Sequence, residues 1–154
     1  MHMESWSPLT PRGSTTEGTA ATQAGRGDLR LVIPYTTHEL TRGALEGAVK
    51  LARGLGADLT LVAVQVVPFP CPLSRPTVDP DHLKRELLTV AKTSSLCTRI
   101  LVVRARDRET GFSSALAPDS LVLVATKRRW WRTAEEKLAR SLARAGHSVA
   151  LIPT

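Results

Sequence analysis

The feature that most constrains the fold is an alternation of short β-branched apolar runs with segments of helical periodicity between residues 29 and 154. The apolar runs predict five strands, over residues 29–35, 58–67, 98–105, 120–126 and 148–152. The almost uninterrupted run at 58–67 indicates a strand covered on both faces, as in a parallel sheet. Strands that alternate with helices favour an α/β fold with a single open, doubly wound, mostly parallel five-stranded sheet.

Four helices are predicted between these strands, and most carry a start or stop signal. Thr36 and Glu39 have capping-box spacing before the first helix. The third helix is short and predicted around residues 110–117. The other signals are the stops Gly54, Gly56 and Gly146 and the caps Asp79 and Thr133. The inner stripe of the first helix is predicted to comprise Leu40, Ala44, Ala48, Leu51, Ala52 and Leu55.

Residues 1–28 differ from the rest because they are rich in Thr, Ser, Gly, Ala and Pro and lack apolar periodicity. They predict a disordered tail, native or partly introduced by cloning, before one folded domain at 29–154. The two cysteines, Cys71 and Cys97, form no CxxC pair and favour a reducing compartment. No apolar run reaches membrane-spanning length and no signal-type stretch opens the chain, so we expect a cytoplasmic protein.

The formal net charge is +7, and most of the excess lies in one segment. Residues 127–144 hold seven cationic and two anionic side chains, a net charge of +5. Such a segment can attract nucleic acid, anionic lipid or an acidic partner. It can equally be the solvated face of a helix, and composition alone leaves both interpretations open.

Ligands of open α/β sheets bind beyond the carboxyl ends of the strands, here the loops 34–38, 67–78, 104–110 and 126–133. None contains a dinucleotide or P-loop glycine motif, no G-x-S-x-G elbow occurs, and the histidines are scattered. We therefore predict no catalytic residue and no metal ligands, and expect a protein that is not an enzyme. Candidates for ligand contact at this cleft are Pro34, Thr36, His38, Thr126, Lys127 and Arg128.

Residues 29–154 resemble the universal stress proteins in the order and length of their elements. The resemblance is carried by VIPY at 32–35, PDSLVLV at 118–124 and SVALIP at 148–153. It implies the strand order 3-2-1-4-5. It also implies a homodimer, which fits an apolar edge strand that self-pairing would cover, formed by Val149, Ala150, Leu151 and Ile152.

The nucleotide motif of the ATP-binding family members is absent. Their Asp after the first strand is replaced by Thr36, and the paired glycines after the fourth strand read Ala125 and Arg128. Glu135 and Glu136 stand where a Gly-[Ser/Thr] pair is expected. We therefore expect no ATP and no other cofactor, and interpret the chain as a binding or regulatory module. The alternatives are a divergent nucleotide-binding or weakly hydrolytic member and a basic peripheral module that contacts nucleic acid or anionic membrane.

A basic tryptophan segment replaces the glycine loop. Two adjacent tryptophans flanked by cations offer a large apolar area that favours a contact. They can form a lid over the cleft, a partner or dimer contact, or a docking site for anionic membrane or nucleic acid. The residues concerned are Arg129, Trp130, Trp131 and Arg132.

Overall fold

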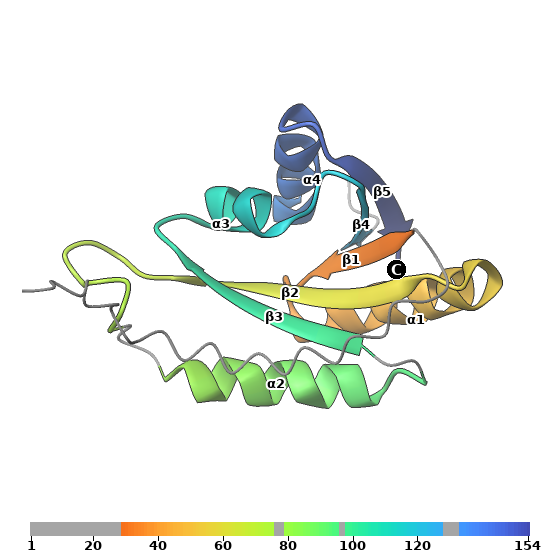
Figure 1. Cartoon of the computed structure of the whole chain (residues 1–154), viewed down its shortest axis with the longest axis horizontal. Helices are drawn as coiled ribbons and strands as arrows, with labels where there is room; N and C mark the ends of the chain where they lie inside the picture. The colour runs from red at the N-terminus through yellow and green to blue at the C-terminus, as the bar shows by residue number, and fades with distance from the viewer. Residues whose placement is uncertain (1–28, 76–78, 96–97, 128–132) are drawn as a thin grey trace, which may run out of the picture.

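The computed structural model describes residues 29–75, 79–95, 98–127 and 133–154, so the predicted tail lies outside the described residues. Strands and helices alternate along the chain, as the sequence predicts (Figure 1). The strands are β1 (Arg30–Pro34), β2 (Asp58–Val66), β3 (Thr98–Ala105), β4 (Ser120–Thr126) and β5 (Ser148–Pro153). The helices are α1 (His38–Leu55), α2 (Pro80–Lys92), α3 (Arg108–Ala115) and α4 (Ala134–Arg144).

The five strands form one sheet in the order β3-β2-β1-β4-β5, and every neighbouring pair is parallel. The predicted fold class and strand order are therefore confirmed. Leu31 of β1 is in register with Leu59 of β2 on one side and with Leu121 of β4 on the other. The strand order reverses between β1 and β4, which is where ligands of such sheets bind.

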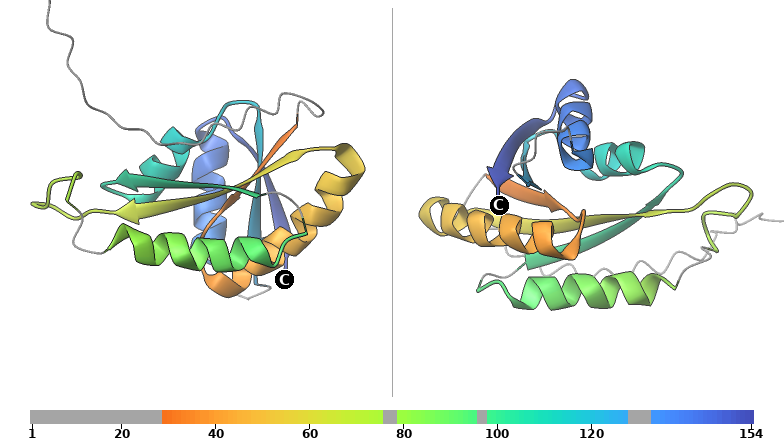
Figure 2. Two further views of the ribbon diagram at one scale, coloured as in Figure 1. Left: turned by 60° about the horizontal axis from the view of Figure 1, so that its bottom comes forward. Right: turned by 180° about the vertical axis from the view of Figure 1, so that it is seen from behind.

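Two apolar layers hold the helices on the sheet. Helices α1 and α2 cover one face, and α3 and α4 cover the other (Figure 2). Leu31 and Ile33 pack in the α1–α2 layer, whereas Val32 packs in the α3–α4 layer, because successive side chains of a strand point to opposite faces. This alternation explains why β1 reads as a continuous apolar run and is buried on both sides.

Three helix signals are confirmed and one is displaced. Asp79 accepts from the N–H of Asp81, Thr133 accepts from the N–H of Glu136, and Gly56 ends α1 with a φ of 63°. The capping residue of α1 is Thr37, which accepts from the Leu40 N–H, so the prediction of Thr36 was wrong by one residue.

Two further expectations are corrected by packing. Helix α3 begins at Arg108 rather than near residue 110, because the Asp107 side chain accepts from the Thr110 N–H and caps the helix earlier. Leu51 and Leu55 are 39% and 53% exposed, although Ala52 between them is only 2% exposed. The inner stripe of α1 is therefore shorter than its periodicity predicts.

Helix α3 approaches the sheet closely at Gly111. A Cβ added there would lie 2.5 Å from Cγ1 of Val64 in β2 and 2.9 Å from Cβ of Ala105 in β3. Glycine is needed at this position for space, and Phe112, the next residue, is fully buried in the α3–α4 layer. This contact fixes the start of α3 beside the carboxyl ends of β2 and β3.

Candidate functional site

The candidate cleft is the edge at which β1 and β4 end, since the strand order reverses there. The first turn of α1 follows β1, and Lys127 follows β4. Lys127 Nζ lies 2.7 Å from Oε2 of Glu39, and this ion pair joins the two sides of the reversal point. The contact lowers the pKa of the Glu39 carboxyl, chiefly through the hydrogen bond from Lys127 and then through its charge.

The predicted cleft residues gather at this edge as far as the structure describes them. Pro34 is buried at the end of β1, and His38 is exposed as the first residue of α1. Thr36 donates its backbone N–H to Oγ1 of Thr41, at 3.2 Å. Thr126 is 9% exposed, and its carbonyl accepts from the backbone N–H of Thr154.

Arg128 and the tryptophan segment at 129–132 lie outside the described residues, so their predicted roles as ligand contacts, lid or partner surface stay predictions.

Two side chains that the sequence did not indicate as site residues form hydrogen bonds at the end of β1. Arg108 of α3 donates from Nη2 to the carbonyl oxygen of Tyr35, at 3.1 Å, and its guanidinium lies over the Phe112 ring. Tyr35 in turn donates its hydroxyl to Oε2 of Glu86 on α2, at 3.3 Å. The residue after β1 is thus held from both faces of the sheet.

The side chain of Arg106 holds the loop after β2. Arg106, just after β3, donates from Nη1 to the carbonyl oxygens of Val67, Pro68 and Cys71, at 3.1, 3.3 and 2.7 Å. Its guanidinium also stacks over the ring of Phe69, 4.0 Å from the centroid. Periodicity and motif spacing carry no signal for these contacts, because each partner lies more than thirty residues away.

Two cavities lie between α3 and α4, where the sequence predicted no site. One has a volume of about 420 Å³ and the other about 430 Å³. Both are lined by Glu109 and Ser141, whose side chains are joined by a hydrogen bond of 2.7 Å from the serine hydroxyl to the carboxylate. Asp107 also lines the second cavity, and its pKa is lowered by the hydrogen bonds it accepts from Thr110.

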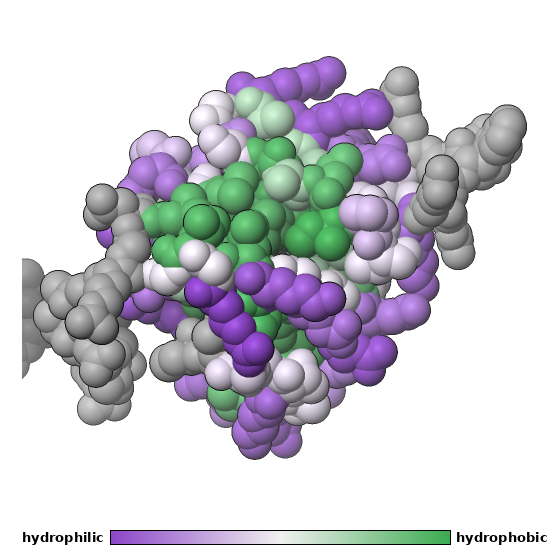
Figure 3. Space-filling view, turned by 90° about the vertical axis from the view of Figure 1, so that its right-hand side faces the viewer, coloured by the Kyte–Doolittle hydropathy of each residue, from purple (hydrophilic) through white to green (hydrophobic). Residues whose placement is uncertain are grey.

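The predicted dimer edge is an edge strand, since β5 pairs only with β4 in the described sheet. Leu151 is 51% exposed, whereas Val149, Ala150 and Ile152 are partly buried. Figure 3 shows an apolar patch on the side of the molecule where β5 and the end of α1 lie, surrounded by hydrophilic side chains.

Two other kinds of feature are absent from the described residues. No group of three His, Cys, Asp or Glu side chains there could hold a metal ion. No helix in the same residues is long and apolar enough to cross a membrane.

No protein-family model matches the sequence, and no curated protein does. Solved structures do resemble the fold. A protein from the universal stress protein family of Burkholderia pseudomallei is 20% identical, with a TM-score of 0.55 over 81% of this chain and 96% of that one.

Two other solved structures give the same result. A universal stress protein in complex with cAMP is 12% identical, with a TM-score of 0.55 over 85% of this chain and 99% of that one. Universal stress protein UspA from Lactobacillus plantarum is 16% identical, with a TM-score of 0.51 over 83% and 99%. At these identities the similarity concerns the fold alone, and the chain has the fold of the universal stress proteins.

Proposed function

We propose that this protein is a binding or regulatory module of the universal-stress-protein type that does not bind ATP and acts without catalysis, as a homodimer. The observation that carries the proposal is the ion pair between Lys127 and Glu39. Lys127 is the described cation just after β4, and its charge is already matched by a carboxylate from the first turn of α1.

The start of α1 offers a phosphate fewer donors than a bare helix end. A triphosphate needs several converging N–H donors and net positive potential. The N–H of Leu40 is taken by the side chain of Thr37, and the N–H of Thr36 by that of Thr41. Glu39 adds a negative charge in the same turn, which opposes an anion.

The start of α4 supports the same conclusion. Thr133 accepts from the N–H of Glu136 and so occupies one of the free donors of the first turn. Glu135 and Glu136 place two carboxylates in that turn, where an anion would otherwise interact with the helix dipole. At each of these helix starts one backbone donor is therefore occupied and at least one carboxylate lies in the first turn.

Calorimetric titration of the full chain with Mg-ATP tests the proposal. At the cleft, read from the amide shifts of Thr37 and Lys127 in a parallel NMR titration, we expect no binding tighter than about 1 mM, which corresponds to about 4 kcal/mol. Heating the purified protein and chromatographing the supernatant checks that no nucleotide was already bound. A micromolar dissociation constant with shifts at these two amides, or adenine nucleotide in the supernatant, would overturn the proposal.

A divergent nucleotide-binding protein is the second candidate, and one observation favours it. A solved structure with the same fold is bound to cAMP. A cyclic monophosphate carries one negative charge and needs fewer donors than a triphosphate, so a cleft poor in donors excludes it less strongly. Titration with cAMP under the same conditions separates the two candidates, since a micromolar constant for cAMP alone selects the second.

A further inference from the structure

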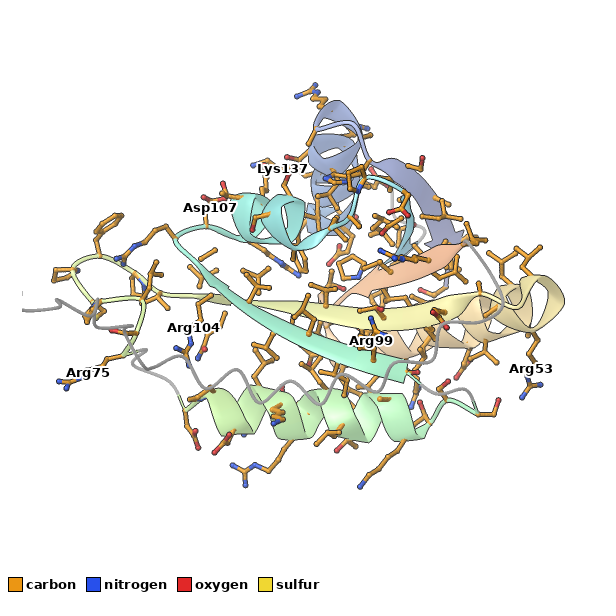
Figure 4. All side chains as sticks on the ribbon, in the orientation of Figure 1. Arg53, Arg75, Arg99, Arg104, Asp107 and Lys137 are labelled. Atoms are coloured by element: carbon orange, nitrogen blue, oxygen red, sulfur yellow. The ribbon has the colours of Figure 1, made fainter. Side chains whose placement is uncertain are left out.

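The two cavities between α3 and α4 form a groove that the function proposed above does not use, and the cations lie in the first cavity. Both are lined by Glu109 and Ser141, so they adjoin at this hydrogen-bonded pair. In Figure 4, Asp107 at the start of α3 and Lys137 on α4 lie on the same side of the sheet. The groove therefore lies on the α3–α4 layer, and its first cavity reaches Thr133 and Ala134 at the start of α4.

Three cations of α4 line the first cavity. Lys137, Arg140 and Arg144 are spaced by three and four residues, which places them on one face of the helix. The buried residues of α4 lie on its other face and are Leu138, Ala139 and Leu142. In the described part of the chain none of the three cations forms an ion pair.

The helix itself explains only part of this arrangement, since Glu136 lies four residues before Arg140. Cations stabilise a helix near its carboxyl end, which accounts for Arg144 in the last turn. Lys137 lies in the amino-terminal half, where the helix dipole disfavours a positive charge. Like charges three or four residues apart also repel each other. An anion in the groove would relieve this repulsion.

The carboxylates that line the groove are already engaged. Glu109 accepts from the Ser141 hydroxyl at 2.7 Å. Asp107 accepts from the N–H of Thr110 and caps α3. The first cavity is therefore lined by three cations against one carboxylate. Ser141 and Ser114 already donate their hydroxyls, to Glu109 and to the Gly111 carbonyl oxygen. The lining hydroxyl residues of the two cavities are Thr110, Ser113, Ser114, Thr133 and Ser141.

We propose that the groove between α3 and α4 is a binding site for a small phosphorylated molecule. Guanidinium and ammonium groups that line one cavity suit the oxygens of a phosphate. A volume of about 420 Å³ is within the range of small-molecule sites. Lys137, Arg140 and Arg144 hold the phosphate, and Glu109 sets its position by repulsion.

Binding of inorganic pyrophosphate to the full chain tests this site, by calorimetry and by amide chemical shifts in NMR. We expect a dissociation constant below about 1 mM. The shifted amides should belong to Glu109, Lys137 and Ser141, while those of Thr37 and Lys127 at the cleft stay in place. Absence of binding, or shifts confined to the cleft, would contradict the site.

A matched pair of triple variants separates a built site from general attraction. Lys137→Gln/Arg140→Gln/Arg144→Gln should weaken pyrophosphate binding about tenfold or more, and glutamine keeps the helix propensity of α4. Lys50→Gln/Lys84→Gln/Lys92→Gln removes the same charge from exposed positions on α1 and α2 and should leave binding within about twofold. Equal losses in both would mean diffuse attraction and overturn the proposal.

A variant with the opposite expected sign covers the case in which the triple variant fails to fold. Glu109→Gln keeps an acceptor for the Ser141 hydroxyl but removes the negative charge, so pyrophosphate should bind about threefold tighter. Unchanged or weaker binding would count against the site. Changes in the amide chemical shifts of Thr37 and Lys127 on addition of Mg-ATP would instead contradict the function proposed for the cleft. They would not contradict the site proposed in the groove.

Discussion

The hydroxyl of Tyr35 lies 3.3 Å from Oε2 of Glu86 and joins the residue after β1 to the middle of α2. Burial of the phenol raises its pKa above the ordinary 10.0, and the charge and hydrogen bond of Glu86 raise it further. Glu86 also lies 3.5 Å from His82 on the same helix. The contact is thus a probe of how tightly the cleft edge is held against the α1–α2 layer.

Ultraviolet titration can measure this contact directly, because Tyr35 is the single tyrosine of the chain. We expect its ionisation midpoint above 10.0 in the folded protein. Glu86→Gln should lower the midpoint without abolishing the shift, since burial is the largest cause. The folded state holds the phenol proton more tightly, so this contribution to stability is present below pH 10 and lost as the pH rises through the folded pKa. A midpoint at or below 10.0 would contradict the contact.

The ion pair at the cleft makes a second prediction. Lys127→Met should raise the pKa of Glu39 toward its ordinary value of 4.5, because the hydrogen bond and charge that lower it are removed. Carbon-detected NMR titration of the Glu39 carboxyl measures the change, and Lys50→Met serves as a control elsewhere on α1. The wild-type pair contributes stability above pH 4.5, and this contribution is lost as the pH falls through the lowered pKa of Glu39. The stability of Lys127→Met should not show this pH dependence. If both variants leave the Glu39 pKa unchanged, the pair does not persist in solution.

The close packing of α3 makes a third prediction. Gly111→Ala places a Cβ 2.5 Å from Cγ1 of Val64, so the helix must shift, and we expect a loss of about 1–3 kcal/mol in the free energy of unfolding. Gly54→Ala is the matched control, because no atom lies within 4 Å of its added Cβ. It should stabilise the protein by about 0.4–1 kcal/mol through the unfolded chain. Urea denaturation measures both, and a neutral Gly111→Ala would refute the close approach.

The apolar edge of β5 makes a fourth prediction. An edge strand with exposed apolar side chains is a template for pairing, and a symmetric dimer covers it. We expect sedimentation velocity at tens of micromolar to give a dimer. Leu151→Asp should convert it to monomer, whereas Leu88→Asp on α2, which is 41% exposed, should not. A wild-type monomer would overturn the dimer.

The sequence predicts the sheet well because strand order depends on features that local patterns carry. Apolar runs mark the strands, and Asp79, Thr133 and Gly56 mark helix ends through contacts within a few residues. The first cap was misplaced because Thr36 and Thr37 are adjacent and both can accept a hydrogen bond. The choice between them depends on where β1 ends, which the local pattern does not specify.

The site was harder to predict, since its contacts join distant elements. The pairing of Lys127 with Glu39 and the convergence of Lys137 with Glu109 depend on how the helices lie on the sheet. The basic character of 127–144 was visible, but the sequence did not separate residues at the cleft from residues in the groove. The domain boundary at residue 29 and the role of the tryptophan segment stay predictions.

The hydrogen bonds of Arg106 determine which substitutions the loop after β2 can accept. Proline has no N–H, so the prolines at 68, 70 and 72 leave the loop short of its own donors. Arg106, just after β3, provides a donor in their place, and three carbonyl oxygens of the loop accept from it. A backbone carbonyl is the same whichever side chain its residue bears. Substitutions at the accepting positions should therefore leave the backbone path of the loop intact. A single substitution of Arg106 should free the loop from this path. A synthetic peptide of the loop alone, which lacks Arg106, should not adopt it.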